Sequence, residues 1–294
     1  MKDVTSRYKG AFFVLLSAFL YGFIPILAVF AYKKDVSVMS FHLVRFTIAS
    51  VALFCLLYLR RGEAALMVGK KKLFQLFVLG GVLFTLTSFS YFSSFKYIPA
   101  SMAALIFYSY PALVSVGSSY INKEYLSMTL VLSIVVSFMG LIFLSGKTAI
   151  SVSIKGVLLA GLGALSYTSY ILYGNFIIKD VPYQVVVAYV CFFSAISFLI
   201  LGSVARGLAL PNASSTWILL CFVAFVSLFG FLSFFLGVEL TSPSIAAILS
   251  MAEPLVTVVL SLLIFKEYLS ITQYFGGVLV LVGSFLALKA SASR

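Results

Sequence analysis

The sequence predicts an all-α polytopic membrane protein, with ten transmembrane helices in a 5+5 inverted-topology repeat and both termini cytoplasmic. Three observations predict this fold class: the apolar composition, the apolar runs along the whole chain, and an internal repeat. Of the 294 residues, 63% are hydrophobic and only 10% are charged. Soluble domains are typically about half apolar and about a quarter charged. The mean hydropathy of +1.17 therefore argues against a soluble fold.

Ten apolar runs are long enough to cross the roughly 30 Å hydrocarbon core of a bilayer. In chain order, they cover about residues 10–32, 39–59, 73–95, 100–121, 127–145, 155–178, 183–205, 215–238, 244–265 and 270–288. The linkers are short, so consecutive spans are expected to be antiparallel neighbours. Basic residues precede the first run as in a signal peptide, but it is longer than a normal signal core and lacks a convincing cleavage site. We expect it to be retained as a span.

The distribution of Lys and Arg predicts the orientation, because short cytoplasmic loops carry an excess of both. With the N-terminus inside, twelve of these residues lie on the cytoplasmic side and seven on the other side, with Arg45 left out because it lies within a span. The cluster at residues 60–61 and 70–72 contributes most to this difference. The net charge of +12 then reflects loops facing anionic lipid headgroups, so lipid is an expected partner and nucleic acid is not.

An internal repeat relates the two halves at an offset of 143 residues. Residues 97–144 align with residues 240–287, and the pentapeptide KEYLS occurs at 123–127 and again at 266–270. We expect two units, residues 1–147 and 148–294, with five spans each. Because five is odd, the second unit enters the membrane from the opposite side, which places Lys123 and Lys266 on opposite faces. Many secondary transporters are built from such inverted repeats.

Three segments resemble the EamA branch of the drug/metabolite transporter superfamily. They are LVRFTIAS at 43–50, SPSIAAILSMAEPLVTVVLSLLIFKEYLS at 242–270, and the related SMAALIFYSYPALVSVGSSYINKEYLS at 101–127. The resemblance implies a basket of helices around a central substrate cavity. It also implies movement of amino acids, nucleotide-related metabolites, sugars or drugs across the bacterial inner membrane, often as export.

The expected function is secondary transport of a small metabolite, such as an amino acid, by alternating access. The sequence has no ATP-binding segment, so a gradient or an exchange must drive transport, with a proton as candidate coupling ion. A lipid flippase or scramblase and a nucleotide-related metabolite exchanger remain alternatives. We expect no catalytic residues, cofactor or metal site, because the single histidine and three cysteines have no ligand spacing. We expect the protein to work as a monomer.

Charged residues within spans are costly in lipid and usually mark function. Glu253 is the only deep carboxylate, about nine residues into its span, and directly precedes Pro254. It is expected to bind a cationic group or carry a proton, or else to be a structural partner. Arg45 is expected either to pair with Glu253 or to extend to the outer headgroups. His42 is expected to be a hydrogen-bonded residue at the membrane boundary.

Hydroxyl and aromatic residues within the spans form a second candidate set, because a buried phenol needs a polar partner. Together with Glu253, the expected substrate-binding residues are Tyr21, Ser88, Tyr91, Phe95, Tyr108, Tyr110, Tyr167, Tyr170 and Ser250. Such a set suits a substrate that is partly apolar or planar and has an ionic head. Tyr32 is interpreted as an interfacial tyrosine without a functional role.

Small residues at heptad spacing recur in the fifth and tenth spans. Ser133 and Gly140 in the fifth span are equivalent to Gly276 and Gly283 in the tenth. Small residues let two helices approach closely in lipid. We therefore expect these two spans to pack together and hold the halves in contact.

Overall fold

The computed structural model describes residues 4–292, except for residues 64–65, 95, 99, 123–126, 145–152, 210, 212 and 266–269. All regular structure in the described residues is helical, as predicted. The α-helices are α1 (Val4–Tyr32), α2 (Val38–Arg61), α3 (Lys70–Phe77), α4 (Thr85–Ser94), α5 (Ala100–Phe107), α6 (Tyr110–Asn122), α7 (Met128–Leu144), α8 (Ile154–Ile177), α9 (Tyr183–Val204), α10 (Ser214–Leu240), α11 (Pro243–Leu249), α12 (Glu253–Phe265) and α13 (Ile271–Ala292). A π-helix, η2 (Val78–Phe84), joins α3 to α4, and a 3₁₀ turn, η3 (Ser250–Ala252), joins α11 to α12.

These elements coincide with the ten apolar runs, but not every run is a single long helix. Within the described residues, seven helical segments are long and apolar enough to cross a membrane. Two further apolar helices, at Met128–Phe143 and Ile271–Ala287, are shorter. The fourth run is divided into α5 and α6. The multi-pass architecture therefore holds, while the count of ten crossings remains a prediction.

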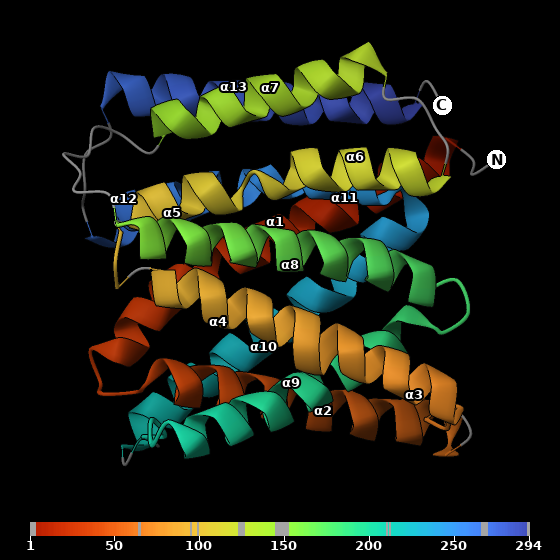
Figure 1. The fold of residues 1–294 in the computed structure, drawn as a ribbon, viewed down its shortest axis with the longest axis vertical. Coiled ribbons are helices and arrows are strands. Elements are labelled where there is room, and N and C mark those ends of the chain that lie inside the picture. The colour runs from red at the N-terminus through yellow and green to blue at the C-terminus, as the bar shows by residue number, and fades with distance from the viewer. Residues whose placement is uncertain are drawn as a thin grey trace.

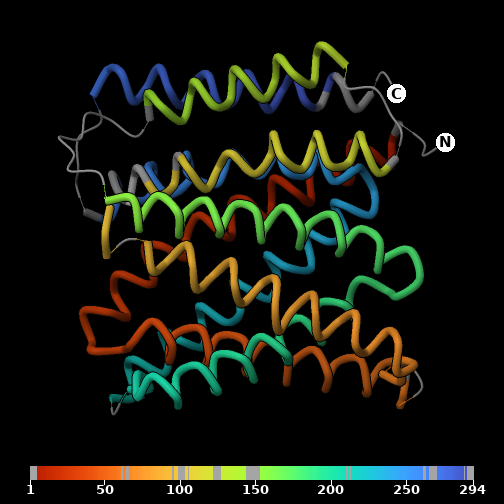
Figure 2. The backbone as a smooth tube through the Cα atoms, viewed as in Figure 1, coloured from red at the N-terminus to blue at the C-terminus, as the bar shows by residue number. Residues whose placement is uncertain are grey.

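The helices form one antiparallel bundle (Figure 1). The first turn of α1 and the last turn of α13 lie at the same end of the bundle, which we call the terminal end, and the other end is the distal end. The helix pair α7 and α13 forms one edge of the bundle, and α2 with α9 forms the opposite edge. The tube in Figure 2 shows α1, α8, α11 and α12 between these edges. The twin KEYLS segments fall almost wholly outside the described residues.

Two of the runs are broken at equivalent positions of the repeat. Helix α6 begins at Tyr110 and is followed by Pro111, while α12 begins at Glu253 and is followed by Pro254. Proline has no backbone N–H and cannot donate the hydrogen bond that would continue the helix. Discontinuous helices of this kind place helix ends and polar side chains near the middle of a membrane transporter. The breaks place Tyr110 and Glu253 in the bundle interior.

The π-helix η2 frees backbone carbonyls, and hydroxyl groups satisfy them. Ser194 Oγ and Ser197 Oγ, both on α9, donate hydrogen bonds to the carbonyl oxygens of Gly80 and Gly81, each at 2.9 Å. A Cβ on Gly80 would lie 2.6 Å from the backbone of Val190. The π-helix therefore packs directly against the backbone of α9, a contact that only glycine permits.

Helices α7 and α13 make a close contact through the small residues singled out above. A Cβ on Gly140 would lie 2.7 Å from Gly276 O, and one on Gly283 would lie 2.9 Å from Ser133 O. Backbone atoms thus meet backbone atoms across this interface. The contact joins the last helix of each half within one chain.

We predict that Gly140→Ala destabilises the protein by about 1–3 kcal/mol, because the added methyl group must push two backbones apart. The matched control is Gly161→Ala on α8, where an added Cβ has nothing within 4 Å. Since alanine favours helix over glycine by up to about 1 kcal/mol, the control should be neutral or stabilising. Thermal unfolding in detergent checks this. Equal melting temperatures for the two variants would show that the α7–α13 contact is not tight.

Candidate functional site

The bundle encloses a cavity of about 620 Å³. Its walls come from both halves of the chain, including α1, α4 and α5 of the first half and α8, α12 and α13 of the second. Typical small-molecule sites are about 300–1,000 Å³ in volume and mostly apolar with a few polar groups. The volume therefore suits a small organic solute.

The cavity lies between the middle and the distal end of the bundle. From α1 it is lined by residues in the C-terminal half of the helix, such as Pro25 and Tyr32, and from α13 by Gln273, close to the start of that helix. Toward the terminal end, α1 packs closely against α10. A Cβ on Gly10 would lie 2.7 Å from Leu240 Cβ, and one on Gly237 would lie 3.1 Å from Val14 N. The terminal end is therefore closely packed, whereas the distal end contains the cavity.

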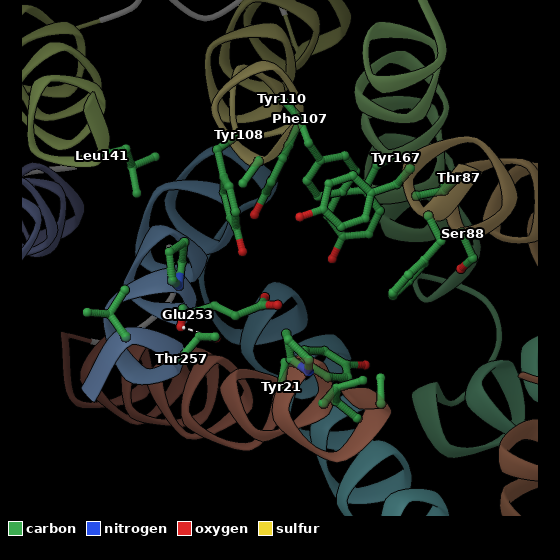
Figure 3. A pocket seen from close by; sticks show the side chains of 18 of the residues that line it. Tyr21, Thr87, Ser88, Phe107, Tyr108, Tyr110, Leu141, Tyr167, Glu253 and Thr257 are labelled. Carbon is green, nitrogen blue, oxygen red and sulfur yellow. Dashed lines mark hydrogen bonds between the residues drawn. The ribbon is translucent and has the colours of Figure 1, made fainter. Parts of the chain in front are cut away.

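Glu253 occupies the inner end of the cavity. The helix break before α12 places it in the first helical turn, where the helix dipole favours a negative charge. Its carboxylate points into the cavity, and the Tyr108 hydroxyl points toward it and interacts with it (Figure 3). One turn later, Thr257 Oγ1 donates a hydrogen bond to Gly22 O at 3.0 Å, which fixes α12 against α1. The carboxylate is therefore held by a rigid contact between the two halves.

Arg45 also lines the cavity, in the part closer to the distal end. It is only 5% exposed, and its guanidinium carbon lies 4.4 Å from the centre of the Phe46 ring. Both Arg45 and Glu253 are described, and no ion pair joins them. Arg45 interacts electrostatically with Glu253 without contacting it. The expectation of extension to the headgroups is wrong, because Arg45 is buried inside the protein.

Aromatic rings line much of the same cavity as the two charged residues. Tyr91 and Phe107 have ring centres 4.3 Å apart, and Tyr110 and Tyr167 meet edge to face at 4.7 Å. The hydroxyls of Tyr108 and Tyr167 are directed into the cavity in Figure 3. Aromatic walls of this kind accept apolar or planar groups.

The cavity brings together most of the residues expected to bind substrate: Tyr21, Ser88, Tyr91, Tyr108, Tyr110, Tyr167 and Glu253. Tyr170 lies behind the wall, with its ring stacked on Tyr167 at 5.7 Å. Ser250 does not line the cavity, and its Oγ donates a hydrogen bond to Ala246 O at 2.9 Å. Phe95 lies outside the described residues.

Several lining residues were not expected from the sequence, namely Tyr32, Thr87, Phe107, Thr257 and Gln273. Thr257 follows Glu253 by one helical turn, so its position could have been found from helical spacing. Phe107 lies at the helix break before Tyr110, which the sequence did not reveal. Tyr32 was interpreted as an interfacial residue, yet its hydroxyl oxygen is buried in the protein.

His42 differs most from its expected role. It is fully buried rather than at a boundary, with its ring stacked on Phe198 at 4.8 Å and on Phe46 at 5.8 Å. Neither ring nitrogen has a hydrogen-bond partner among the described residues. The prediction of a hydrogen-bonded boundary residue is therefore wrong. His42 instead contributes a ring to the aromatic packing beside Arg45.

A bundle of long apolar helices around a central cavity with enclosed charges defines a multi-pass membrane protein. The sequence profile of the EamA-like transporter family matches residues 8–146 and residues 154–289. The chain therefore belongs to this family and has its two-repeat architecture. The chain is similar to a solved structure described as "Crystal structure of protein". The match covers 96% of this chain and 97% of the other chain, with a TM-score of 0.82 and 19% sequence identity. It supports the fold alone. No curated protein matches the chain significantly.

Proposed function

We propose that this transporter moves a small organic solute, such as an amino acid, across the bacterial inner membrane by alternating access. The transport is secondary, driven by a gradient or by exchange, and works in the export direction. The observation that carries the proposal is the cavity of about 620 Å³ between the two halves, with the Glu253 carboxylate at its inner end. A solute held there contacts both repeats, so its binding can bias how they pack against each other.

Alternating access is supported by the asymmetry of the cavity. The distal half of the bundle is hollow, while close α1–α10 packing shuts the terminal half. Because the two repeats are inverted, exchanging their conformations would open the terminal half and close the distal one. With both termini cytoplasmic, as the charge count favours, the cavity here faces the outside.

Glu253 is proposed as the coupling residue. It is the ionisable carboxylate of the cavity lining, and the helix break fixes its position near the middle of the bundle. A carboxylate in such a cavity can hold either a proton or a cationic group of the solute. Competition between the two would exchange a proton for the solute across the membrane without ATP.

The test is uptake and counterflow in proteoliposomes with a panel of labelled metabolites, with and without a proton gradient. We expect saturable counterflow of at least one small solute, and faster net movement when the gradient is imposed. Movement of labelled phospholipid between leaflets in the same vesicles, without solute counterflow, would contradict the proposal and favour a lipid flippase or scramblase.

Two equivalent contacts link the halves at the opposite ends of the bundle. At the terminal end, Lys72 at the start of α3 forms an ion pair with Asp180 beyond the end of α8. At the distal end, Lys34 Nζ donates to Ser215 Oγ at 3.0 Å, beyond α1 and at the start of α10. Each contact joins the start of the third span of one half, α3 or α10, to the end of the first span of the other half, α8 or α1. We propose that the ionic contact favours closure of the terminal end.

We predict that Asp180→Asn makes the protein slightly less stable at neutral pH. The hydrogen bond and charge of Lys72 lower the pKa of the Asp180 carboxyl below its ordinary value. A lowered pKa means that the stabilisation is complete above the ordinary carboxyl pKa and is lost as the pH falls through the lowered value. Both residues are partly exposed, so the effect should be small and should disappear at high salt.

Melting temperatures of the wild type and Asp180→Asn, measured across pH at low and high salt, check this prediction. The matched control is Asp35→Asn, the equivalent change in the other repeat, where no ion pair is lost among the described residues. A wild-type advantage over Asp180→Asn that persists at acid pH or in high salt would contradict the ion-pair explanation.

A further inference from the structure

We propose that Arg45 and Tyr32 form an anion subsite at the distal side of the cavity, built for the carboxylate of the transported solute. The inference rests on the proposed function, because it assigns a part of the solute to a part of the same cavity. Both residues line the cavity, one from α2 and one from the last residue of α1. Within the described residues, no ion pair accounts for Arg45 and no hydrogen bond accounts for the Tyr32 hydroxyl.

The first observation is the missing counter-charge of Arg45. The residue is 5% exposed and has no ion-pair partner among the described residues, and its Nε has no hydrogen-bond partner there. The Phe46 ring at 4.4 Å covers one face of the guanidinium but accepts none of its N–H donors. A buried charge without a partner is strongly destabilising. Its place in a cavity wall indicates that a ligand supplies the missing negative charge.

The second observation is an unpaired hydroxyl beside the arginine. The Tyr32 hydroxyl oxygen is buried and has no hydrogen-bond partner among the described residues. Tyr32 and Arg45 interact electrostatically, so the two groups lie near each other. Tyr21 lies about three helical turns before Tyr32 on the same face of α1 and is also close to Arg45. One cation and neutral phenol donors thus surround the same space.

The chemistry of these donors favours a carboxylate over a phosphate. The planar fork of a guanidinium matches the two oxygens of a carboxylate, and a phenol adds one further donor. A single arginine neutralises one negative charge, which a carboxylate carries. A phosphate dianion would keep a second charge in a cavity that also contains Glu253. The subsite therefore selects a monoanionic group.

The two charged residues then define the polarity of the solute. Arg45 and Glu253 face one cavity without pairing, and aromatic rings line the same cavity. A solute with a carboxylate, a cationic group and an apolar or planar body would satisfy both residues at once. A solute with only one of these groups leaves one residue unpaired.

The experiment measures binding with three probes that share one ring and differ only in charge. They are L-phenylalanine, 3-phenylpropionate without the amine, and 2-phenylethylamine without the carboxylate. Binding to the purified full-length protein is measured by isothermal titration and by ligand-induced thermal stabilisation. We expect L-phenylalanine to bind the wild type most tightly, and 3-phenylpropionate to bind measurably.

Two variants separate the subsite from a structural role. Arg45→Met should weaken binding of the two carboxylate probes about tenfold or more while leaving 2-phenylethylamine unchanged, since a hydrogen bond to a charged group is lost. Tyr32→Phe removes only an unpaired buried hydroxyl, so it should not destabilise the fold. It should nevertheless weaken binding of the two carboxylate probes several-fold. If Arg45→Met does not fold, Tyr32→Phe still decides the question. Glu253→Gln should show the reverse selectivity: it should weaken binding of 2-phenylethylamine, which has the cationic group.

Each result supports or overturns the subsite. Binding of 2-phenylethylamine without either carboxylate probe overturns the subsite but leaves the role of Glu253 and the transport proposal intact. Carboxylate binding that is equal in the wild type, Arg45→Met and Tyr32→Phe also overturns it. No binding of any probe overturns the assignment of polarity, and counterflow with the wider metabolite panel then tests transport separately.

Discussion

Glu253→Gln is expected to lose proton-driven transport while folding normally. The glutamine keeps the size and hydrogen bonding of the side chain, but it removes the carboxylate that faces Tyr108 and the cavity. A charge-assisted interaction of about 1.5–3 kcal/mol corresponds to roughly a 10- to 100-fold loss in binding of a cationic group. Because the glutamine does not titrate, the pH dependence of uptake should also disappear, although some exchange can remain. Uptake in proteoliposomes at several pH values measures both effects.

The matched control for this variant is Glu239→Gln, the same chemical change at an exposed position near the end of α10. It should transport with wild-type rate and pH dependence. Wild-type transport and pH dependence in Glu253→Gln would show that Glu253 is only structural. If Glu253→Gln failed to fold and Arg45→Met restored the fold, the two residues would form a scaffold pair. The missing ion pair between them leads us to expect no such rescue.

Ser88→Phe is expected to abolish transport by filling the cavity. Ser88 lines the cavity from α4, and Figure 3 shows it on the wall that faces Glu253. A phenyl group at this position would occupy space that the solute needs. Because the added ring projects into a cavity and not into packed protein, the fold should tolerate it. Counterflow should fall to the level of empty vesicles, and the melting temperature should change little.

Two control variants identify the cause of that loss. Ser169→Phe makes the same substitution at an exposed position on α8 and should transport normally. Ser88→Ala removes the hydroxyl but keeps the space, and it should retain most of the activity. Normal counterflow in Ser88→Phe would mean that the solute does not pass through this cavity.

The sequence predicted the helical elements well because the membrane imposes a simple rule. Apolar runs must be helical and about 20 residues long, so their boundaries agree closely with the helices. The breaks before Tyr110 and Glu253 and the π-helix at Val78–Phe84 were not predicted. A proline in an apolar run permits a break without requiring one, and nothing in a run of glycine and aliphatic residues indicates a π-helix.

The sequence predicted only part of the site, and the physical reason for success or failure differs from residue to residue. Glu253 stood out because a carboxylate deep in a span is rare. The role of Arg45 depended on whether it meets Glu253, which is a question of tertiary distance that sequence spacing does not determine. The burial of His42 and of the Tyr32 hydroxyl was not predicted, because aromatic residues near span ends are common at membrane interfaces. Tyr32 packs against residues of α1, α2 and α10, and His42 packs against rings of α2, α4 and α9.

Access to one cavity residue from both sides of the membrane tests the central proposal most directly. Ser88→Cys in a background lacking Cys55, Cys191 and Cys221 can be labelled with an impermeant maleimide from either side of oriented vesicles. Ser227→Cys, fully buried in α10 away from the cavity, is the matched control and should react from neither side. Alternating access predicts that Ser88→Cys reacts from both sides and that a transported solute slows both reactions. Labelling from one side alone, whatever solute or gradient is applied, would contradict the proposal.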